Sequence, residues 1–284
     1  MKASSFGYAR PESLAEALEL LARHGERAKL LAGGQSLIPS LNLRLSSPAL
    51  LIDLGNLSEL EGIALQGKDL RIGALTRHRA IERSPVVAAH APLLAQAAPH
   101  IAHVAIRNRG TFGGSLAMSD PAAEWPACCL ALGASIVVAS ARGERRVQAE
   151  RFFKSLYATD LAPDEILVAA EIPAAAADSR SVFLELARRR GDYAIVGVAA
   201  QARRSKGRLQ DVRLAFLGVA AVPLLARRAM AALEGRPCDA AAIAAAERAL
   251  GDELEPMADL YHSAATKLHL ARVLAGRALA ALAA

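Results

Sequence analysis

The chain has 284 residues, of which 53% are hydrophobic and 22% are charged, and its 34 basic and 28 acidic residues give a net charge of +6. This length and composition exclude an intrinsically disordered chain and indicate one large or two ordinary domains, each with a proper hydrophobic core. The basic residues are spread along the chain with almost no interleaved aromatic residues, which argues against nucleic-acid binding.

The positions of the cysteines, the histidines and the apolar runs argue against four further classes of protein: disulfide-rich, metal-binding, membrane-spanning and secreted. Three cysteines are too few for a disulfide framework or for the four thiolates of an iron–sulfur cluster, and His100 and His103 have no further ligands at zinc spacing. The longest uncharged run, residues 125–141, is shorter than a membrane span, and the N-terminus lacks the apolar stretch of a secretory signal. We therefore expect a cytoplasmic protein with no membrane insertion and no bound metal.

The first part of the chain, residues 1–56, indicates a small unit of helix and strand. Ser13 followed by Glu16 predicts a capping box ahead of apolar residues at helical spacing, and Gly25 ends that helix. Short apolar runs predict strands at residues 28–32 and 50–54.

A second unit is predicted over residues 57–175. Residues 80–98 are mostly helical with breaks at Pro85 and Pro92, and another helix begins between Pro121 and Pro126 and ends at Gly133. Apolar runs predict three strands, at residues 70–74, 134–139 and 165–172, the last one stopped by Pro173.

The small and polar segment 174–181 is the best linker candidate, and we place a second domain at residues 178–284. Residues 193–204 and 208–217 predict two strands joined as a hairpin by Ser205-Lys206-Gly207. Alanine-rich helices are predicted to follow at residues 224–233, 240–250 and 264–283.

Two glycine pairs after apolar runs are the most informative places for chemistry. The first lies in residues 31–37 (LAGGQSL) and the second in residues 110–115 (GTFGGS). Glycine lets backbone N–H groups converge without side-chain obstruction, so each loop could bind a phosphate, with hydroxyl donors from Ser36, Thr111 and Ser115. The alternative is that both are tight turns. Neither loop fits the G-x-G-x-x-G fingerprint or the P-loop.

No nucleophile arrangement of serine, histidine and carboxylate is recognisable. Asp120 and Glu124 lie four residues apart and would share one face of a helix, either as a general acid–base pair or as the acidic start of that helix. The residues alone therefore predict an α/β protein with two candidate anion sites and no hydrolytic machinery.

Three segments together resemble a known family. They are residues 32–37 with residues 39–45 (PSLNLRL) after them, residues 106–115 (IRNRGTFGGS) with residues 120–124 (DPAAE), and residues 188–197 (RRRGDYAIVG). In this order they resemble the FAD-binding medium subunit of the molybdenum hydroxylases, of the xanthine dehydrogenase and carbon monoxide dehydrogenase type. The resemblance covers essentially the whole chain.

The resemblance implies an α+β fold. A two-part PCMH-type FAD-binding domain would occupy residues 1–175, with subdomains at about 1–56 and 57–175. A smaller C-terminal domain of β-sheet and helices, of the carbon monoxide dehydrogenase flavoprotein type, would occupy residues 178–284.

The resemblance also implies a site for FAD, bound without covalent attachment because neither loop contains a His or Cys. The two loops would bind the cofactor phosphates, Ile101 and Leu167 would contact the flavin, and Tyr193 would lie near the isoalloxazine unless it packs inward from a strand. Glu124 replaces a usual Asp that hydrogen-bonds the cofactor, and Glu185 stands where many relatives carry Lys. The implied cofactor-binding residues are Leu31, Ala32, Gly33, Gly34, Gln35, Ser36, Leu37, Ile101, Gly110, Thr111, Phe112, Gly113, Gly114, Ser115, Glu124, Leu167 and Tyr193.

The implied partners are a large subunit with the molybdenum cofactor and a small subunit with two [2Fe–2S] clusters, assembled as a dimer of heterotrimers. Electrons would pass through the clusters to FAD and on to NAD, a quinone or oxygen, and this chain would supply no catalytic side chain. Two alternatives remain: a self-sufficient flavoprotein oxidase, and a scaffold that has lost FAD.

Overall fold

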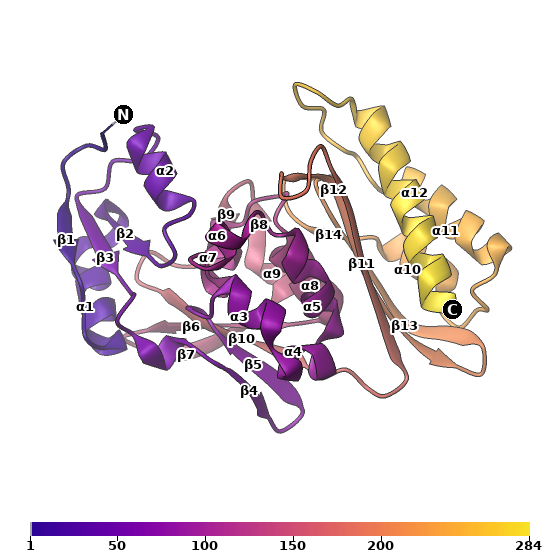
Figure 1. The fold of residues 1–284 in the computed structure, drawn as a ribbon, viewed down its shortest axis with the longest axis horizontal. Helices are drawn as coiled ribbons and strands as arrows, with labels where there is room; N and C mark the ends of the chain where they lie inside the picture. Colours follow the sequence, from indigo (N-terminus) through magenta and orange to yellow (C-terminus); the bar gives the residue numbers. More distant parts are fainter. Residues whose placement is uncertain (1) are drawn as a thin grey trace.

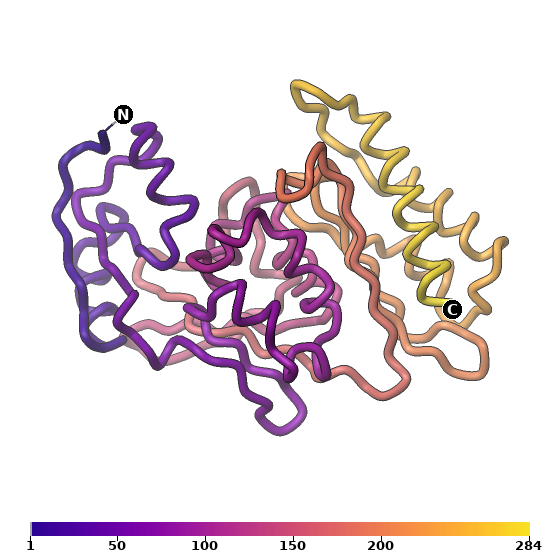
Figure 2. The backbone as a smooth tube through the Cα atoms, viewed as in Figure 1, coloured from indigo at the N-terminus to yellow at the C-terminus, as the bar shows by residue number. Residues whose placement is uncertain are grey.

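The computed structural model describes residues 2–284 and contains three main β-sheets with helices packed between and beside them (Figure 1). Each sheet is built from one continuous stretch of the chain, so the tube completes one unit before it enters the next (Figure 2). The N-terminus lies at one end of the molecule and the last helices at the other. This mixture of helix and sheet confirms the α+β prediction.

The N-terminal unit consists of β1 (Gly7–Ala9), α1 (Leu14–His24), β2 (Ala28–Leu31), α2 (Leu37–Asn42) and β3 (Leu50–Asp53). Its three strands are parallel in the order β1-β3-β2, and α1 packs its apolar face against them. The predicted cap is confirmed, because Ser13 Oγ accepts a hydrogen bond from the Glu16 N–H at 3.2 Å. In a capping box the Glu16 carboxylate would accept a hydrogen bond from the N–H of Ser13. Here it accepts from the N–H of Glu12 instead.

The central unit is an antiparallel sheet in the order β4-β5-β10-β6-β7. Its strands are β4 (Ile63–Gln66), β5 (Asp69–Gly73), β6 (Ser135–Ser140), β7 (Gly143–Gln148) and β10 (Ile166–Pro173), with a small ribbon of β8 (Phe153–Ser155) and β9 (Ala158–Thr159). Its helices are α3 (His78–Arg83), α4 (Pro85–His90), α5 (Pro92–Ala97), α6 (Val104–Arg107), α7 (Phe112–Met118), α8 (Glu124–Leu132) and α9 (Ala149–Phe152). Short 3-10 turns lie at Gly25–Arg27, Ser58–Leu60 and Ala98–His100.

Both faces of the central sheet are buried, and each has a different neighbour. Along β6, Ile136 and Val138 belong to the core formed with the helices, whereas Val137 and Ala139 belong to the core shared with the N-terminal unit. This alternation follows from the two-residue period of a strand. The central sheet therefore fixes the N-terminal unit relative to α7 and α8.

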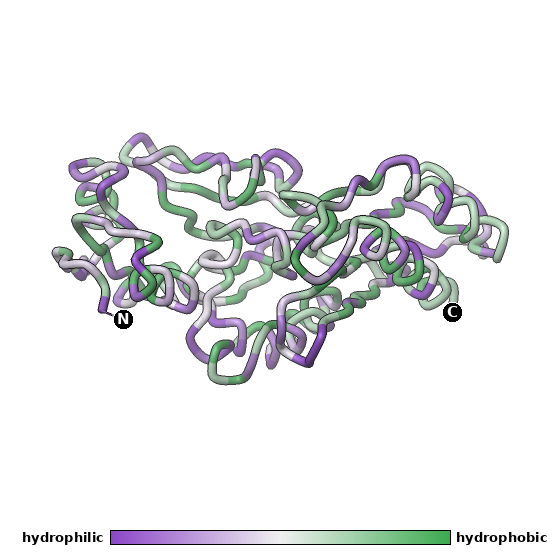
Figure 3. Tube along the Cα trace, turned by 90° about the horizontal axis from the view of Figure 1, so that it is seen from above, coloured by the Kyte–Doolittle hydropathy of each residue, from purple (hydrophilic) through white to green (hydrophobic). Residues whose placement is uncertain are grey.

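The C-terminal unit consists of β11 (Ser179–Ala187), β12 (Ala194–Ser205), β13 (Arg208–Leu217), β14 (Leu224–Leu225), α10 (Arg227–Leu233), α11 (Ala240–Gly251) and α12 (Ala264–Ala283). Its antiparallel sheet lies between α5 and α8 on one face and the C-terminal helices on the other (Figure 1). Ala199 of β12 packs with the central helices, while Val198 and Ala200 pack with the C-terminal ones. Viewed from above, apolar segments of the chain gather in the middle of the molecule, and more polar segments lie in the outer turns (Figure 3).

Several sequence predictions are confirmed at the level of single elements. The predicted hairpin forms as β12 and β13, the helix at residues 264–283 has those bounds, and prolines open α4 and α5. Gly133 ends α8 with a φ of 65°, the left-handed conformation that favours glycine.

Other predictions are wrong in detail. The linker prediction for residues 174–181 fails at its end, because Ser179 already pairs with Arg203 as the start of β11. Pro173 is the last residue of β10, an end position where a proline is tolerated, and the first two residues of the predicted helix at 224–233 form β14. Asp120 precedes α8, so it does not share a helix face with Glu124.

Within residues 2–284, no helix combines the length and the apolar character needed to cross a membrane.

Candidate functional site

A cavity of about 1090 Å³ lies where the three units meet. Its wall contains fifteen of the residues that the resemblance implicates, namely Ala32, Gly33, Gly34, Gln35, Ser36, Leu37, Ile101, Gly110, Thr111, Gly113, Gly114, Ser115, Glu124, Leu167 and Tyr193. Two others are not in this wall. Leu31 lines a smaller neighbouring cavity, and Phe112 is fully buried with its ring against Trp125.

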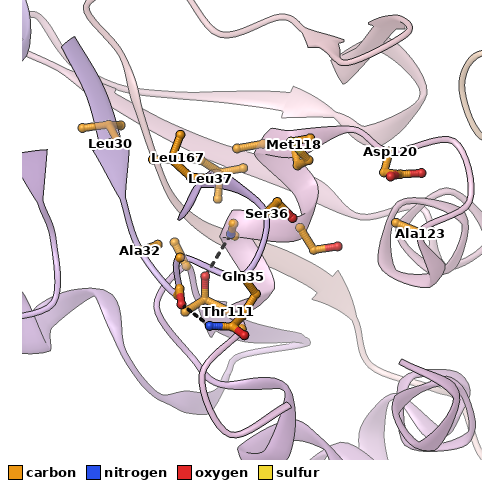
Figure 4. A pocket seen from close by; sticks show the side chains of 18 of the residues that line it. Leu30, Ala32, Gln35, Ser36, Leu37, Thr111, Met118, Asp120, Ala123 and Leu167 are labelled. Atoms are coloured by element: carbon orange, nitrogen blue, oxygen red, sulfur yellow. Dashed lines mark hydrogen bonds between the residues drawn. The ribbon is translucent and has the colours of Figure 1, made fainter. Parts of the chain in front are cut away.

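The first glycine loop follows β2 and passes directly against the second. A Cβ at Gly33 would overlap the Arg109 carbonyl oxygen and would come within 2.8 Å of the Gly110 Cα. Gly34 has a φ of 71°, and the Gln35 side chain donates to the Gly33 carbonyl at 2.9 Å (Figure 4). Only glycine therefore permits the two loops to meet.

The second glycine loop opens α7. Thr111 Oγ1 accepts a hydrogen bond from the Gly114 N–H at 3.2 Å and caps the helix. A Cβ at Gly113 would lie 2.5 Å from Ala74 Cβ, so α7 packs directly on the chain after β5. The backbone of this loop thus faces the cavity while Phe112 anchors it from behind.

The cavity has an apolar wall and an acidic end. Leu37, Met118 and Leu167 project from separate elements toward the same space, whereas Asp120 lies beyond Met118, next to Ala123 (Figure 4). Phosphates would be attracted to the glycine loops and repelled from the acidic end.

Glu124 is the buried carboxyl of the acidic end. It is the first residue of α8 and is only 8% exposed. Burial, followed by repulsion from Glu185, raises the pKa of the Glu124 carboxyl to about 8. Burial also raises the pKa of Asp120, which accepts a hydrogen bond from the Ala122 N–H at 2.9 Å.

Tyr193 lies in the loop between β11 and β12 and is 74% exposed. The alternative that this residue packs inward from a strand is therefore wrong, because β12 begins only at Ala194. Tyr193 lines the cavity together with Asp192 and Gly191.

His78 is a cavity residue that the sequence reasoning missed. Trp125 Nε1 donates to His78 Nδ1 at 2.9 Å, so the proton of the neutral ring is on Nε2. That Nε2 lies beneath the second glycine loop, where a Cβ at Gly110 would come within 2.7 Å of it. Burial, then the charges of Arg107 and Arg77, lower the pKa of His78 to about 4. No local motif indicates this role, since His78 and Trp125 are far apart in the sequence.

The buried Arg107 side chain stabilises the segment of the cavity wall that contains Ile101 and Ala102. Its buried guanidinium donates to the carbonyls of Ile101 at 2.9 Å and Ala102 at 3.0 Å and pairs with Glu82 at 2.9 Å. Ala102 has a φ of 41°, which is uncommon for a residue with a Cβ. The ion pair therefore fixes an unusual turn of the cavity wall.

The fold and the cavity together indicate which class of ligand this protein binds. Two glycine loops from separate units meet at one large cavity that also has apolar lining residues, as a large phosphate-bearing cofactor requires. Within residues 2–284, no group of three or more His, Cys, Asp or Glu side chains is arranged to bind a metal ion.

Comparison with known proteins identifies the cofactor class. Residues 4–175 match the family described as FAD binding domain in molybdopterin dehydrogenase, and residues 181–282 match the CO dehydrogenase flavoprotein C-terminal domain. The chain is 38% identical over 281 residues to the 6-hydroxypseudooxynicotine dehydrogenase complex subunit alpha of Paenarthrobacter nicotinovorans, covering 99% of this chain and 95% of that one.

Two solved structures resemble the whole chain. One is a carbon monoxide dehydrogenase from Hydrogenophaga pseudoflava that lacks the Mo-pyranopterin moiety, with a TM-score of 0.97 and 40% identity, covering 99% of this chain and 98% of that one. The other is quinoline 2-oxidoreductase from Pseudomonas putida 86, with a TM-score of 0.94 and 40% identity, covering 100% and 98%.

This chain belongs to the FAD-binding medium subunits of the molybdenum hydroxylases. It is a subunit of an oxidoreductase complex, and its cofactor is FAD. The cavity fits this cofactor, because its glycines let the two loops pack against each other at the wall and its volume suits a dinucleotide.

Proposed function

We propose that this chain passes electrons from a [2Fe–2S] subunit to an external acceptor, which is NAD, a quinone or oxygen, while a molybdenum subunit oxidises the substrate. The observation that carries the proposal is the meeting of two glycine loops, from separate units, at one cavity. FAD bound there supplies chemistry in which electrons are accepted singly or in pairs.

The residues proposed to bind FAD fall into groups that would contact different parts of the cofactor. The loops at residues 31–37 and 110–115 offer backbone N–H groups and hydroxyls to the phosphates. Leu31 and Phe112 support those loops from behind, while Ile101 and Leu167 offer apolar wall. Glu124 and Tyr193 meet the uncharged part of the cofactor, because the acidic end disfavours phosphate.

The binding is proposed to be non-covalent. Neither glycine loop contains a His or Cys, and His78, which lines the cavity as His103 does, is engaged by Trp125 at Nδ1. If the purified protein is precipitated with acid, the flavin should appear in the supernatant. A yellow pellet would contradict non-covalent binding.

The proposed domains are residues 1–175, with subdomains at about 1–56 and 57–175, and residues 178–284. The matched family ranges of 4–175 and 181–282 support this division. The subdomain boundary is supported by the change from the parallel sheet to the antiparallel sheet after Asp53.

The proposed partners are a large subunit with the molybdenum cofactor and a small subunit with two [2Fe–2S] clusters, in a cytoplasmic dimer of heterotrimers. Relatives named as a subunit or medium chain of a dehydrogenase support such an assembly. Those relatives are named for different substrates, which supports placing the substrate site on another subunit.

Co-expression tests this function. The three subunits should purify as one complex, and substrate-dependent reduction of a dye should require that complex. The single chain should show no such turnover. Robust oxidation of an organic substrate by the single chain would contradict the proposal and favour a self-sufficient oxidase, and a purified chain without flavin would favour a scaffold.

A further inference from the structure

A second cavity, of about 570 Å³, borders the first glycine loop, and the proposed cofactor contacts do not account for it. We call it the arginine cavity, because Arg10, Arg77 and Arg109 line it. Residues 32–35 line both this cavity and the larger one, whereas the second glycine loop, residues 110–115, lines only the larger one. The first glycine loop therefore forms part of the wall of two cavities.

The arginine cavity lies at the carboxyl ends of the three parallel strands. Arg10 directly follows β1, residues 32–35 follow β2, and Asp53 is the last residue of β3. The central unit closes the cavity with Arg77, which precedes α3, and with Arg109, which precedes the second glycine loop. In open parallel sheets, ligands bind in the crevice outside the carboxyl ends of the strands. The cavity therefore occupies a position that suits a ligand.

The charge of the arginine cavity is unbalanced. Its lining within residues 2–284 contains three arginines and one acid, Asp53, which leaves a net charge of +2. The Asp53 carboxylate is already engaged, because it accepts hydrogen bonds from the Tyr8 hydroxyl at 2.5 Å and from the Gly55 N–H at 2.9 Å. Arg10 Nε lies 3.9 Å from the same carboxylate, at the long end of the range for an ion pair.

The other two arginines have no acidic partner. Neither Arg77 nor Arg109 forms an ion pair with a carboxylate among residues 2–284. Arg77 donates to the backbone carbonyl of Arg109, which uses one of the five N–H donors of a guanidinium. A cavity lined by one sign of charge concentrates ligands of the opposite sign. These groups therefore favour an anion.

We propose that the arginine cavity binds the phosphate monoester of a small organic molecule, at a site separate from the one that binds FAD. The guanidinium groups match pairs of phosphate oxygens in planar geometry. A phosphate monoester carries a charge of about −2 near neutral pH, which balances the lining. The apolar side chains of Ile38, Pro39 and Ile106 also line the cavity and receive the carbon part of the ligand.

The test is isothermal titration calorimetry of the full-length chain saturated with FAD, at an ionic strength held constant with sodium chloride. The probes are inorganic phosphate and phenyl phosphate. One phosphate should bind per chain, and phenyl phosphate should bind about tenfold more tightly because its ring is partly buried on the apolar lining. Saturation with FAD prevents the probes from binding where the cofactor phosphates bind.

Arginine variants assign the binding to this cavity. Arg77→Gln and Arg109→Gln should each weaken phosphate binding by about tenfold or more, because each removes a charge-assisted hydrogen bond. Arg10→Gln should have the same effect, and it keeps the test valid if the other two variants disturb the glycine loops, since Arg10 pairs with Asp53. The matched control is Arg151→Gln, an exposed arginine on α9, which should leave the affinity unchanged.

Three results would overturn the proposal. They are no binding by the wild type at millimolar phosphate, equal affinities in the wild type and the three cavity variants, and displacement of phosphate by FAD. A repeat of the titration on the co-purified complex gives a further test. Binding retained there supports a small-molecule ligand, whereas binding lost there would overturn it and would assign this face to an acidic partner. A chain that binds no FAD would contradict the proposed function, and the arginine variants would still decide this site.

Discussion

Trp125 donates its indole N–H to His78 Nδ1 at 2.9 Å, and this bond joins α8 to α3 directly beneath the second glycine loop. Both side chains are buried, and the ring centroids lie 5.9 Å apart. Because Nδ1 accepts, the neutral ring carries its proton on Nε2. Protonation of both nitrogens would break this bond and place a charge under the loop.

The stability of the protein should therefore depend on His78 in acid. Its pKa of about 4 in the folded chain lies below the unfolded value of 6.5, so the unfolded chain binds the proton first as pH falls. Stability should decrease between pH 6.5 and pH 4 by about 3 kcal/mol and should be independent of this group outside that window.

Urea unfolding at a series of pH values measures this effect. His78→Gln, which keeps an acceptor for Trp125, should be less stable at pH 7 but should lose most of this acid dependence. The exposed His269→Gln is the matched control and should retain it. An unchanged acid slope in His78→Gln would show that His78 is not the group responsible.

Gly33→Val should abolish FAD binding more than it damages the fold. Its Cβ would overlap the Arg109 carbonyl and separate the two loops, while most of the core lies elsewhere. We expect flavin content to fall more than about tenfold, with a loss of stability of about 1–3 kcal/mol and a near-native circular dichroism spectrum. Ala64→Val, at an exposed position of β4, is the control.

Gly114→Val should also abolish FAD binding more than it damages the fold, although its Cβ would clash with a different atom. Its Cβ would lie 2.6 Å from Thr111 Oγ1 and would displace the cap of α7. Full flavin occupancy in both glycine variants would refute the assignment of these loops.

Arg107→Met should destabilise the chain by about 3–5 kcal/mol, because it leaves two cavity-wall carbonyls without their buried donor and leaves Glu82 with only the more exposed Arg79. Arg79→Met is a matched control, since Arg79 pairs with the same Glu82 at 2.9 Å but is more exposed and should cost less than about 1 kcal/mol. Thermal unfolding compares the two. Equal losses would show that the burial of Arg107 is not what matters.

The sequence predicts the parts of this protein that are encoded locally. Gly133, Pro85 and Pro92 mark helix ends because their backbone preferences act at the residue itself. The whole of β11 was missed, and its first residues were predicted as a linker. Small polar residues such as Ser179 give no strand signal, and the strand forms there through pairing with β12.

The candidate site likewise contains features that the sequence predicts and features that only the structure shows. The two glycine loops are visible in the sequence because each is a continuous motif. The bond between Trp125 and His78, and the ion pair between Arg107 and Glu82, join residues that are distant in sequence. Such pairs depend on how the layers pack, so no local pattern indicates them.

The most direct test of the central claim is the flavin stoichiometry of the purified full-length chain. FAD released by acid should equal one molecule per chain after reconstitution, and the absorption bands of oxidised flavin should be lost in both Gly33→Val and Gly114→Val. A wild-type chain that remains colourless after incubation with excess FAD would contradict the account.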